Sequence, residues 1–308
     1  MRLTFLGTSG GKPTKERNCS AIALECENEK GWYLFDCAEG TQRQILFTHL
    51  SLLGIKAIFI THIHGDHCYG LPGLLTSMML DNRSTSLTIY ASKELKAMVE
   101  AFVDLSLEHL GYEIEWIELH AGFKQGFEHF TLTTLPLIHS VESFAFHIET
   151  KPKINIDKAK LTADGLPPGP LYAKLKSGEA VEFAGKRYDS KDYLIVSEPT
   201  RLIISGDNAE PDILSPYLQN LDLLVHEATY TQDTYDALDK NLLHTTAKTL
   251  ALSATKHNVK HLIATHLSPR YGDPTPIYEE IARYYHHPFW VANDFDRFTI
   301  QDGTIAPS

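Results

Sequence analysis

The chain alternates between short apolar runs and polar, glycine-containing segments, and most of the apolar runs have the composition of strands. Runs of about four to eight residues rich in β-branched and aromatic side chains are typical of β-strands. In the first half these runs follow one another closely. They are LTFLG (3–7), SAIALEC (20–26), GWYLFDC (31–37), IKAIFI (55–60), LTIYAS (87–92), YEIEWIEL (112–119), HFTLTTL (129–135) and SFAFHIE (143–149).

Two segments predict helices, and a third segment breaks the pattern. The apolar run LLTSMML (74–80) suits a buried helix, and KELKAMVEAFVDLSLEHL (93–110) has helical periodicity. Residues 151–192 are rich in Lys, Gly and Pro and weak in apolar periodicity, and they include PPGP at 167–170. Proline lacks the backbone donor and fixes φ, so PPGP cannot lie inside a helix or a central strand. We predict one domain, 1–150 with 193–308, interrupted by an inserted arm at 151–192.

Ionisable side chains recur where the predicted strands end. The run IKAIFI is followed at once by THIHGDH (61–67), and four later runs end in the same way. The residues at or just after the ends of those four runs are His139, Asp207, the pair His226–Glu227, and His266. Open sheets gather their ligands where strands end, so we expect these side chains to meet at one rim.

The segment THIHGDH crowds ligand-type side chains onto one short loop. His62, His64, Asp66 and His67 fall within six positions, and Gly65, Gly70 and Gly73 indicate a tight turn. Imidazole nitrogen and carboxylate oxygen suit zinc, and a shared carboxylate can bridge two ions about 3.5–4 Å apart. The sequence therefore predicts a metal site, which His139, Asp207 and His266 would complete.

Composition limits the class of protein. A chain of 308 residues with 43% hydrophobic residues can build a substantial core. No apolar run is long enough to span a bilayer, and the start MRLTFLGTSGGKP lacks the features of a signal peptide, so we expect a cytoplasmic protein without a membrane segment. The four cysteines contain no CxxC pair, which favours reduced thiols.

Charge separates the insertion from the rest of the chain. The net charge is −11, but residues 151–191 hold nine basic and five acidic side chains, so this segment carries +4 and the remainder −15. A solvated surface would explain such a block, and so would a surface that binds a polyanion. Charge alone leaves both explanations open.

The motifs together resemble the metallo-β-lactamase superfamily, whose HxHxDH signature THIHGDH matches. Within that superfamily the chain resembles the short form of tRNase Z (ribonuclease Z) over essentially its whole length. The matching motifs are the PxKxRN loop at PTKERN (13–18), the GP motif of the exosite at PPGP (167–170), HEAT (226–229), and the AxD motif at AND (292–294). The fold implied is α/β (α+β): a four-layer αββα sandwich with an inserted exosite arm.

The resemblance also implies the metal ligands and the reaction. One zinc ion would be bound by His62, His64, His139 and Asp207, and a second by Asp66, His67, Asp207 and His266, giving two Zn²⁺ per subunit with Asp207 bridging. Hydroxide bound between the metals would attack phosphorus, with Asp66 as proton acceptor. His244, held by Glu227, would protonate the leaving group. Histidine and carboxylate also accept manganese and iron, so the metal used in the cell stays open.

The implied activity is a zinc-dependent endoribonuclease that removes the 3′ trailer from precursor tRNA and leaves a 3′-hydroxyl. The arm would hold the tRNA backbone through its lysines and through Gly169 and Pro170, and Lys15 and Arg17 would contact RNA near the cleavage site. In the family the arm of one subunit clamps tRNA cleaved by the other, so we expect a homodimer. Whether precursors with an encoded CCA end are cleaved stays open.

Two other functions are compatible with parts of the sequence. One is a hydrolase of the same superfamily that acts on a small phosphodiester, thioester or lactam, for which a basic arm has little use. The other is a metal-free RNA-binding or scaffold protein that keeps the fold, against which the intact ligand set argues. Zinc content and removal of the arm distinguish these functions from the tRNA-processing one.

Overall fold

The computed structural model describes residues 1–106, 109–238 and 242–308. These residues form two compact units, one made of Met1–Glu149 and Arg201–Ser308 and the other of Thr150–Thr200. Most predicted strands and both predicted helices are present, although the last part of the 93–110 segment includes residues 107–108, which lie outside the described residues. The sequence predicts an inserted arm at residues 151–192, and these bounds stay a prediction; the compact unit of the structure is Thr150–Thr200.

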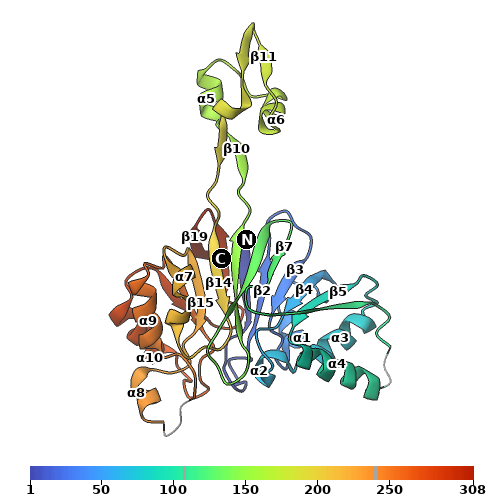
Figure 1. Cartoon of the computed structure of the whole chain (residues 1–308), viewed down its shortest axis with the longest axis vertical. Coiled ribbons are helices and arrows are strands. Elements are labelled where there is room, and N and C mark those ends of the chain that lie inside the picture. The colour runs from blue at the N-terminus through green and yellow to red at the C-terminus, as the bar shows by residue number, and fades with distance from the viewer. Residues whose placement is uncertain (107–108, 239–241) are drawn as a thin grey trace. The chain divides into compact units, whose positions relative to one another are not determined.

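The first unit contains two large sheets (Figure 1). The first sheet has eight strands in the order β19-β18-β1-β2-β3-β4-β5-β6, and its β3 to β6 pairings are parallel. Its strands are β1 (Arg2–Gly7), β2 (Ala21–Glu25), β3 (Trp32–Phe35), β4 (Ile55–Phe59), β5 (Leu87–Ala91), β6 (Ile114–Glu118), β18 (Arg297–Gln301) and β19 (Thr304–Pro307).

The second sheet has seven strands in the order β17-β16-β15-β14-β9-β8-β7, and β14 to β17 are parallel. Its strands are β7 (Lys124–Gly126), β8 (Phe130–Pro136), β9 (Phe144–Thr150), β14 (Arg201–Ser205), β15 (Leu223–Glu227), β16 (Leu262–Thr265) and β17 (Phe289–Val291). Parallel strands in both sheets bring their carboxyl ends to one edge, which is where the ionisable residues follow them.

Helices cover the outer face of each sheet (Figure 1). Those beside the first sheet are α1 (Thr41–Ile45), η1 (Leu52–Gly54), α2 (Gly65–Cys68), α3 (Leu71–Leu80) and α4 (Lys93–Ser106). Those beside the second are η3 (Pro211–Leu214), α7 (Ser215–Leu218), α8 (Gln232–Asp236), α9 (Ala247–Lys256) and α10 (Thr275–Tyr284). The predicted four-layer αββα sandwich is confirmed.

Alternating side chains along each strand build three cores in this unit. In β4, Phe59 enters the core between the two sheets, whereas Ile58 packs toward α3 and α4. In β14, Ile204 enters the same central core, and Ile203 packs toward α9 and α10. Because side chains of a strand alternate between faces, a continuous apolar run is what a strand covered on both faces requires.

The second unit, Thr150–Thr200, has a small core of its own. Strand β10 (Ile154–Ile156) pairs antiparallel with β13 (Leu194–Val196), and β11 (Val181–Phe183) pairs with β12 (Lys186–Tyr188). Helices α5 (Lys158–Ala163) and α6 (Leu171–Lys176) and the 3-10 turn η2 (Ser190–Asp192) complete it. The side chains of this hydrophobic core are Leu161, Leu166, Tyr172, Leu175, Val181, Tyr188 and Tyr193.

Two further expectations concern membranes and thiols. Across the described residues, no helix has both the length and the apolar character that crossing a bilayer demands. All four cysteines are buried and unpaired, as the sequence predicts.

Candidate metal centre and proton donor

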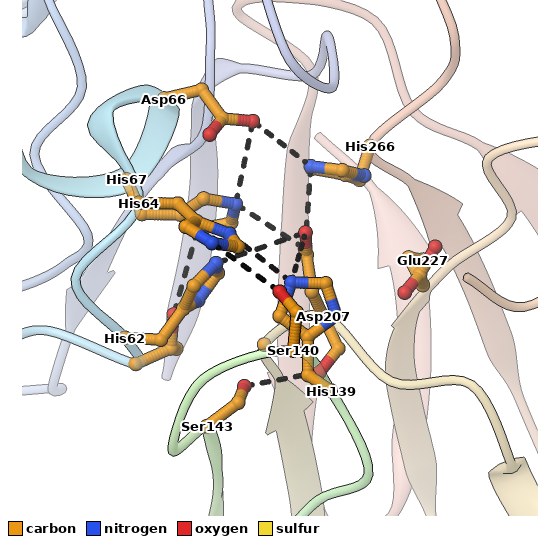
Figure 2. A network of polar contacts seen from close by, with 12 residues as sticks. His62, His64, Asp66, His67, His139, Ser140, Ser143, Asp207, Glu227 and His266 are labelled. Atoms are coloured by element: carbon orange, nitrogen blue, oxygen red, sulfur yellow. Dashed lines mark hydrogen bonds and ion pairs between the residues drawn. The ribbon is translucent and has the colours of Figure 1, made fainter. Parts of the chain in front are cut away.

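The predicted ligands meet at the strand-end rim of the first unit, although they come from both sheets (Figure 2). His62 and His64 lie in the loop after β4, and Asp66 and His67 lie in α2. The other three follow single strands: His139 comes after β8, Asp207 after β14, and His266 after β16. Residues more than a hundred positions apart in the sequence thus face one another.

The ligand atoms form two groups of metal-binding size. One group consists of His62, His64, His139 and Asp207, and the other of Asp66, His67 and His266; within each group the ligand atoms lie within 4.8 Å of one another. A further group of the same size joins Asp207 and His266 to His244.

Asp207 joins the two groups because its two carboxylate oxygens face different histidines. Its Oδ1 is 3.2 Å from Nε2 of both His67 and His266. Its Oδ2 is 3.7 Å from Nε2 of both His62 and His139. Burial alone would raise the pKa of Asp207, but the surrounding histidines hold it well below its usual range. The carboxylate is therefore ionised and placed to bridge two cations.

Outward hydrogen bonds fix how His62 and His67 point. Asp36 accepts hydrogen bonds from the Thr61 hydroxyl at 3.0 Å and lies 2.7 Å from Nδ1 of His67. Since the Thr61 hydroxyl donates to Asp36, it can accept from Nδ1 of His62, 3.0 Å away. Both rings thus have Nδ1 held by an oxygen and Nε2 directed into the site, the orientation in which histidine binds metal.

His139 and His266 are held by the same kind of contact. Nδ1 of His139 lies 3.1 Å from the carbonyl oxygen of Leu243, and Nδ1 of His266 lies 3.0 Å from the Thr229 hydroxyl. His266 has a left-handed backbone, with φ 55°, and its ring lies against Gly10. A Cβ at Gly10 would lie 2.5 Å from that ring, so only glycine leaves the ring room.

The imidazole nitrogens that point into the site test whether a cation fits there. Within the part of the chain that the structure describes, Nε2 of His62 and of His67 is buried without a hydrogen bond. Nδ1 of His64 and Nε2 of His139 lie 3.1 Å apart. Burial also lowers the pKa of His62 well below its ordinary value, which favours the neutral imidazole that binds metal. Unsatisfied buried nitrogens beside ionised carboxylates fit divalent cations.

Asp66 is anchored by the loop after β1. The Gly11 backbone N–H donates to its Oδ2 at 2.6 Å, and Nε2 of His266 lies 3.3 Å from the same oxygen. Burial would raise the pKa of Asp66, but His266 and His67 hold it well below its usual range. The side chain is therefore an ionised acceptor with a fixed orientation.

His244 and Glu227 form a pair beside this centre. Nδ1 of His244 lies 3.0 Å from Oε2 and 3.2 Å from Oε1 of Glu227, the last residue of β15. Glu227 also accepts from the Asn208 backbone N–H and the Thr229 hydroxyl. Burial lowers the pKa of His244, but the Glu227 charge and hydrogen bond outweigh it and raise the pKa to about 9. Cations in the adjacent groups would oppose this rise.

Of the predicted RNA contacts, Lys15 is exposed, whereas Arg17 is buried. The Arg17 guanidinium donates to the Thr8 hydroxyl at 2.6 Å, to the Ala292 carbonyl and to Asn293 Oδ1 at 2.6 Å. It thereby fastens the 13–18 loop to the 292–294 segment. Gly169 and Pro170 lie exposed in the turn before α6, in the second unit.

Three residues of the site were not predicted as part of it: Asp36, Thr61 and Thr229. Each one orients a histidine ring and does not itself belong to a ligand group. A signal existed for Asp36, since it lies near the end of the predicted strand GWYLFDC, and in the structure it directly follows β3 as other site residues follow their strands. Thr229 closes the HEAT motif.

The chain is similar to curated proteins along nearly its whole length. "Ribonuclease Z" of Pseudomonas putida (strain W619) is 38% identical over 99% of this chain and 98% of its own length. "Ribonuclease Z" of Bacillus subtilis (strain 168) is 38% identical over 89% of this chain and 90% of its own. Among solved structures, human tRNase Z, short form, matches with a TM-score of 0.67 and 26% identity, covering 98% of this chain and 100% of that one. Residues 1–161 match the family model described as "Anti-Pycsar protein Apyc1".

Proposed function

This chain belongs to the ribonuclease Z family and is a metal-dependent endoribonuclease of the metallo-β-lactamase fold, and we propose that it removes the 3′ trailer from precursor tRNA, leaving a 3′-hydroxyl on the tRNA. One observation carries the proposal. Two groups of metal-ligand type, bridged by Asp207, lie beside the His244–Glu227 pair in a chain that matches ribonuclease Z relatives almost from end to end.

We assign two divalent cations, with zinc as the first candidate, to the rim. His62, His64, His139 and Asp207 would hold one, and Asp66, His67, Asp207 and His266 the other. Imidazole and carboxylate donors suit zinc, manganese and iron. When bound, such cations would lower the pKa of the nucleophilic water and offset the charge that develops on the phosphoryl oxygens.

Asp66 would orient the attacking water and receive its proton. Its carboxylate is ionised, and the Gly11 N–H fixes one of its oxygens. A preorganised acceptor of this kind needs no rearrangement as the new P–O bond forms.

His244 would protonate the oxygen that leaves. Glu227 occupies Nδ1 of His244, so the proton to be donated is the one on Nε2. Cleavage that leaves a 3′-hydroxyl breaks the bond between phosphorus and the 3′ oxygen, and the proton from His244 goes to that oxygen. The trailer then keeps the phosphate at its 5′ end.

The insertion would hold the tRNA. Lys158, Lys174 and Lys191 are exposed, and among the described residues no hydrogen bond or ion pair engages their ammonium groups. Free cations of this kind bind phosphates of a folded RNA without reading sequence. We further propose that Gly169, Pro170 and Lys15 contact the tRNA, that the protein is a homodimer in which one subunit's arm holds the tRNA cleaved by the other, and that it acts in the cytoplasm.

The test is cleavage of a precursor tRNA that carries a 3′ trailer, using zinc-loaded protein and mapping both product ends. We expect one cut that gives a tRNA with a 3′-hydroxyl and a trailer with a 5′-phosphate. Protein that binds two metals per chain and hydrolyses a chromogenic phosphodiester but leaves the precursor intact would point to a small-molecule hydrolase. Protein with less than one metal per chain and no hydrolysis would point to a metal-free RNA-binding protein.

A further inference from the structure

Tyr230 lies directly beside the proposed proton donor. Its ring centroid is 6.3 Å from that of His244, and the two planes meet at 65°. The backbone of Tyr230 pairs with Thr246 in an isolated bridge, and its carbonyl accepts from the Ala247 N–H at 2.8 Å. Main-chain contacts therefore hold the ring next to His244 while the ring itself stays half-buried, with part of its surface exposed.

A second aromatic ring and a cation surround Tyr230. The centroid of the Tyr235 ring, in α8, lies 6.1 Å from that of the Tyr230 ring. The Ser268 N–H donates to the Thr229 carbonyl at 3.1 Å, and the Thr231 N–H donates to the Tyr271 hydroxyl at 2.9 Å, so the segment that carries Arg270 runs beside Tyr230. Burial raises the pKa of the Tyr230 phenol, and a hydrogen bond with Ser268 and the positive charge of Arg270 oppose that rise. Arg270 is exposed, and within the described ranges its guanidinium makes no hydrogen bond or ion pair. An aromatic face and a free guanidinium are what a nucleotide base and its phosphate bind.

The direction of bond cleavage says which nucleotide reaches this place. The oxygen that leaves phosphorus is the 3′ oxygen of the last nucleotide retained on the tRNA, and His244 delivers a proton to it. The ribose of that nucleotide must therefore lie within reach of His244. The base and the 5′ phosphate of this nucleotide then extend away from the metal centre, toward the side chains that border His244.

We propose that Tyr230 and Arg270 form the subsite for the last nucleotide that stays on the tRNA, with the Tyr230 ring stacked on its base and the Arg270 guanidinium bound to its 5′ phosphate. This subsite rests on the proposed function. Stacking accepts any base, because every base has an aromatic face. The subsite therefore positions the scissile bond in precursors of different sequence.

The test compares two precursors that differ only at the last retained nucleotide, which is intact in one and abasic in the other. On the intact precursor we expect Tyr230→Leu to lower kcat/KM by about 5- to 150-fold, the size of one lost base–aromatic stack. On the abasic precursor, Tyr230→Leu and wild type should be equally active, because no base is left to stack. Tyr230→Phe keeps the ring and should behave as wild type on both.

Controls separate a loss of stacking from a loss of structure. Tyr278→Leu removes an exposed tyrosine from α10 and should leave the ratio of the two substrates unchanged. Thermal unfolding and metal content should match wild type, and Tyr230→Met replaces Tyr230→Leu if the latter does not fold. Arg270→Gln should weaken precursor binding and reduce the salt dependence by about one charge, with Arg283→Gln on α10 as its control.

Two outcomes would overturn the subsite: one leaves the proposed function intact, and the other overturns the proposed function as well. Wild type that cuts the intact precursor, with Tyr230→Leu losing the same factor on both substrates, would show that the ring supports His244 and does not bind the base. Wild type that does not cut the intact precursor would overturn the proposed function, and the subsite with it.

Discussion

The rim of the first unit and the unit Thr150–Thr200 use charged residues in opposite ways. At the rim, Asp207, His62, His67 and His266 are buried, and a neighbour sets the orientation of each of these three histidine rings. In the second unit the lysines are exposed, and some of them serve the unit itself. Lys160 donates to the Asp192 carbonyl, and Lys186 donates to that of Asp164.

This difference predicts how function responds to mutation in the two regions. A buried site with one arrangement should fail when any one ligand is lost. A surface of exposed cations should lose affinity in small steps, one charge at a time.

The first prediction concerns the bridging carboxylate. Asp207→Ala should lower precursor cleavage by about four orders of magnitude or more, as removal of a key catalytic residue does. It should also reduce bound metal, since both ligand groups share this residue. Metal content per chain and single-turnover cleavage measure the two effects. A variant that keeps two metals and normal cleavage would contradict the bridge.

The second prediction concerns the proton donor. His244→Ala should lower kcat by about 10²- to 10⁴-fold, the usual contribution of general acid catalysis, with metal content unchanged. Glu227→Gln removes the charge that raises the pKa of His244. Since the acid must be protonated, activity falls as pH rises through its pKa, so this variant should lose activity at lower pH than wild type. Identical pH–rate profiles would exclude the pair.

The third prediction removes the insertion without disturbing its base. The Asp157 N–H donates to the Tyr193 carbonyl at 2.7 Å, so residues 158–192 can be replaced by an Asn-Gly turn that closes β10 and β13 as a hairpin. Precursor cleavage should fall by about 100-fold, because several phosphate contacts are lost together. Hydrolysis of a chromogenic phosphodiester should not change. If the variant kept both activities, the insertion would have no role in tRNA binding.

The fourth prediction tests a residue that orients a ligand. Asp36→Asn should weaken metal binding by about 10- to 100-fold, the cost typical of losing an outer partner of a metal-binding histidine. Competition with a chelator measures the affinity. Asp212→Asn, at an exposed carboxylate paired with Lys256, is the matched control and should have wild-type affinity. Equal affinity in both variants would mean that Asp36 does not orient His67.

The fifth prediction is the smallest. Lys174→Ala should raise KM for precursor tRNA by a few-fold and lower the slope of log affinity against log salt by about one. Lys186→Ala is the comparison, because its ammonium already donates within the unit. A single lysine whose loss abolished cleavage would contradict the view that binding is spread over many contacts.

The sequence predicts the metal centre well where the ligand residues are close together in the chain. His62, His64, Asp66 and His67 stand together in one motif, and the strand-end pattern identifies the single residues His139, Asp207 and His266. The layers also follow, because strands buried on both faces must be continuous apolar runs. These features depend on composition and order, which a sequence displays directly.

What the sequence does not display is the direction of side chains across long separations. The sequence predicts Arg17 to be an exposed cation in a polar loop. In the structure its guanidinium is buried against Ala292 and Asn293, which are far away in the chain. Asp36 and Thr229 take part in the site because the fold places each of them beside a histidine ring. Helices α5 and α6 of the second unit each have six residues, too few to establish a periodicity.

The metal-dependent cleavage mechanism is tested by comparing precursor tRNA cleavage by zinc-loaded wild type and Asp66→Ala, with the product ends mapped. We expect a cut next to the last nucleotide retained on the tRNA in the wild type, and a rate lower by orders of magnitude in the folded variant. Cleavage at wild-type rate by Asp66→Ala, or no cleavage by folded wild type carrying two metals, would contradict this mechanism.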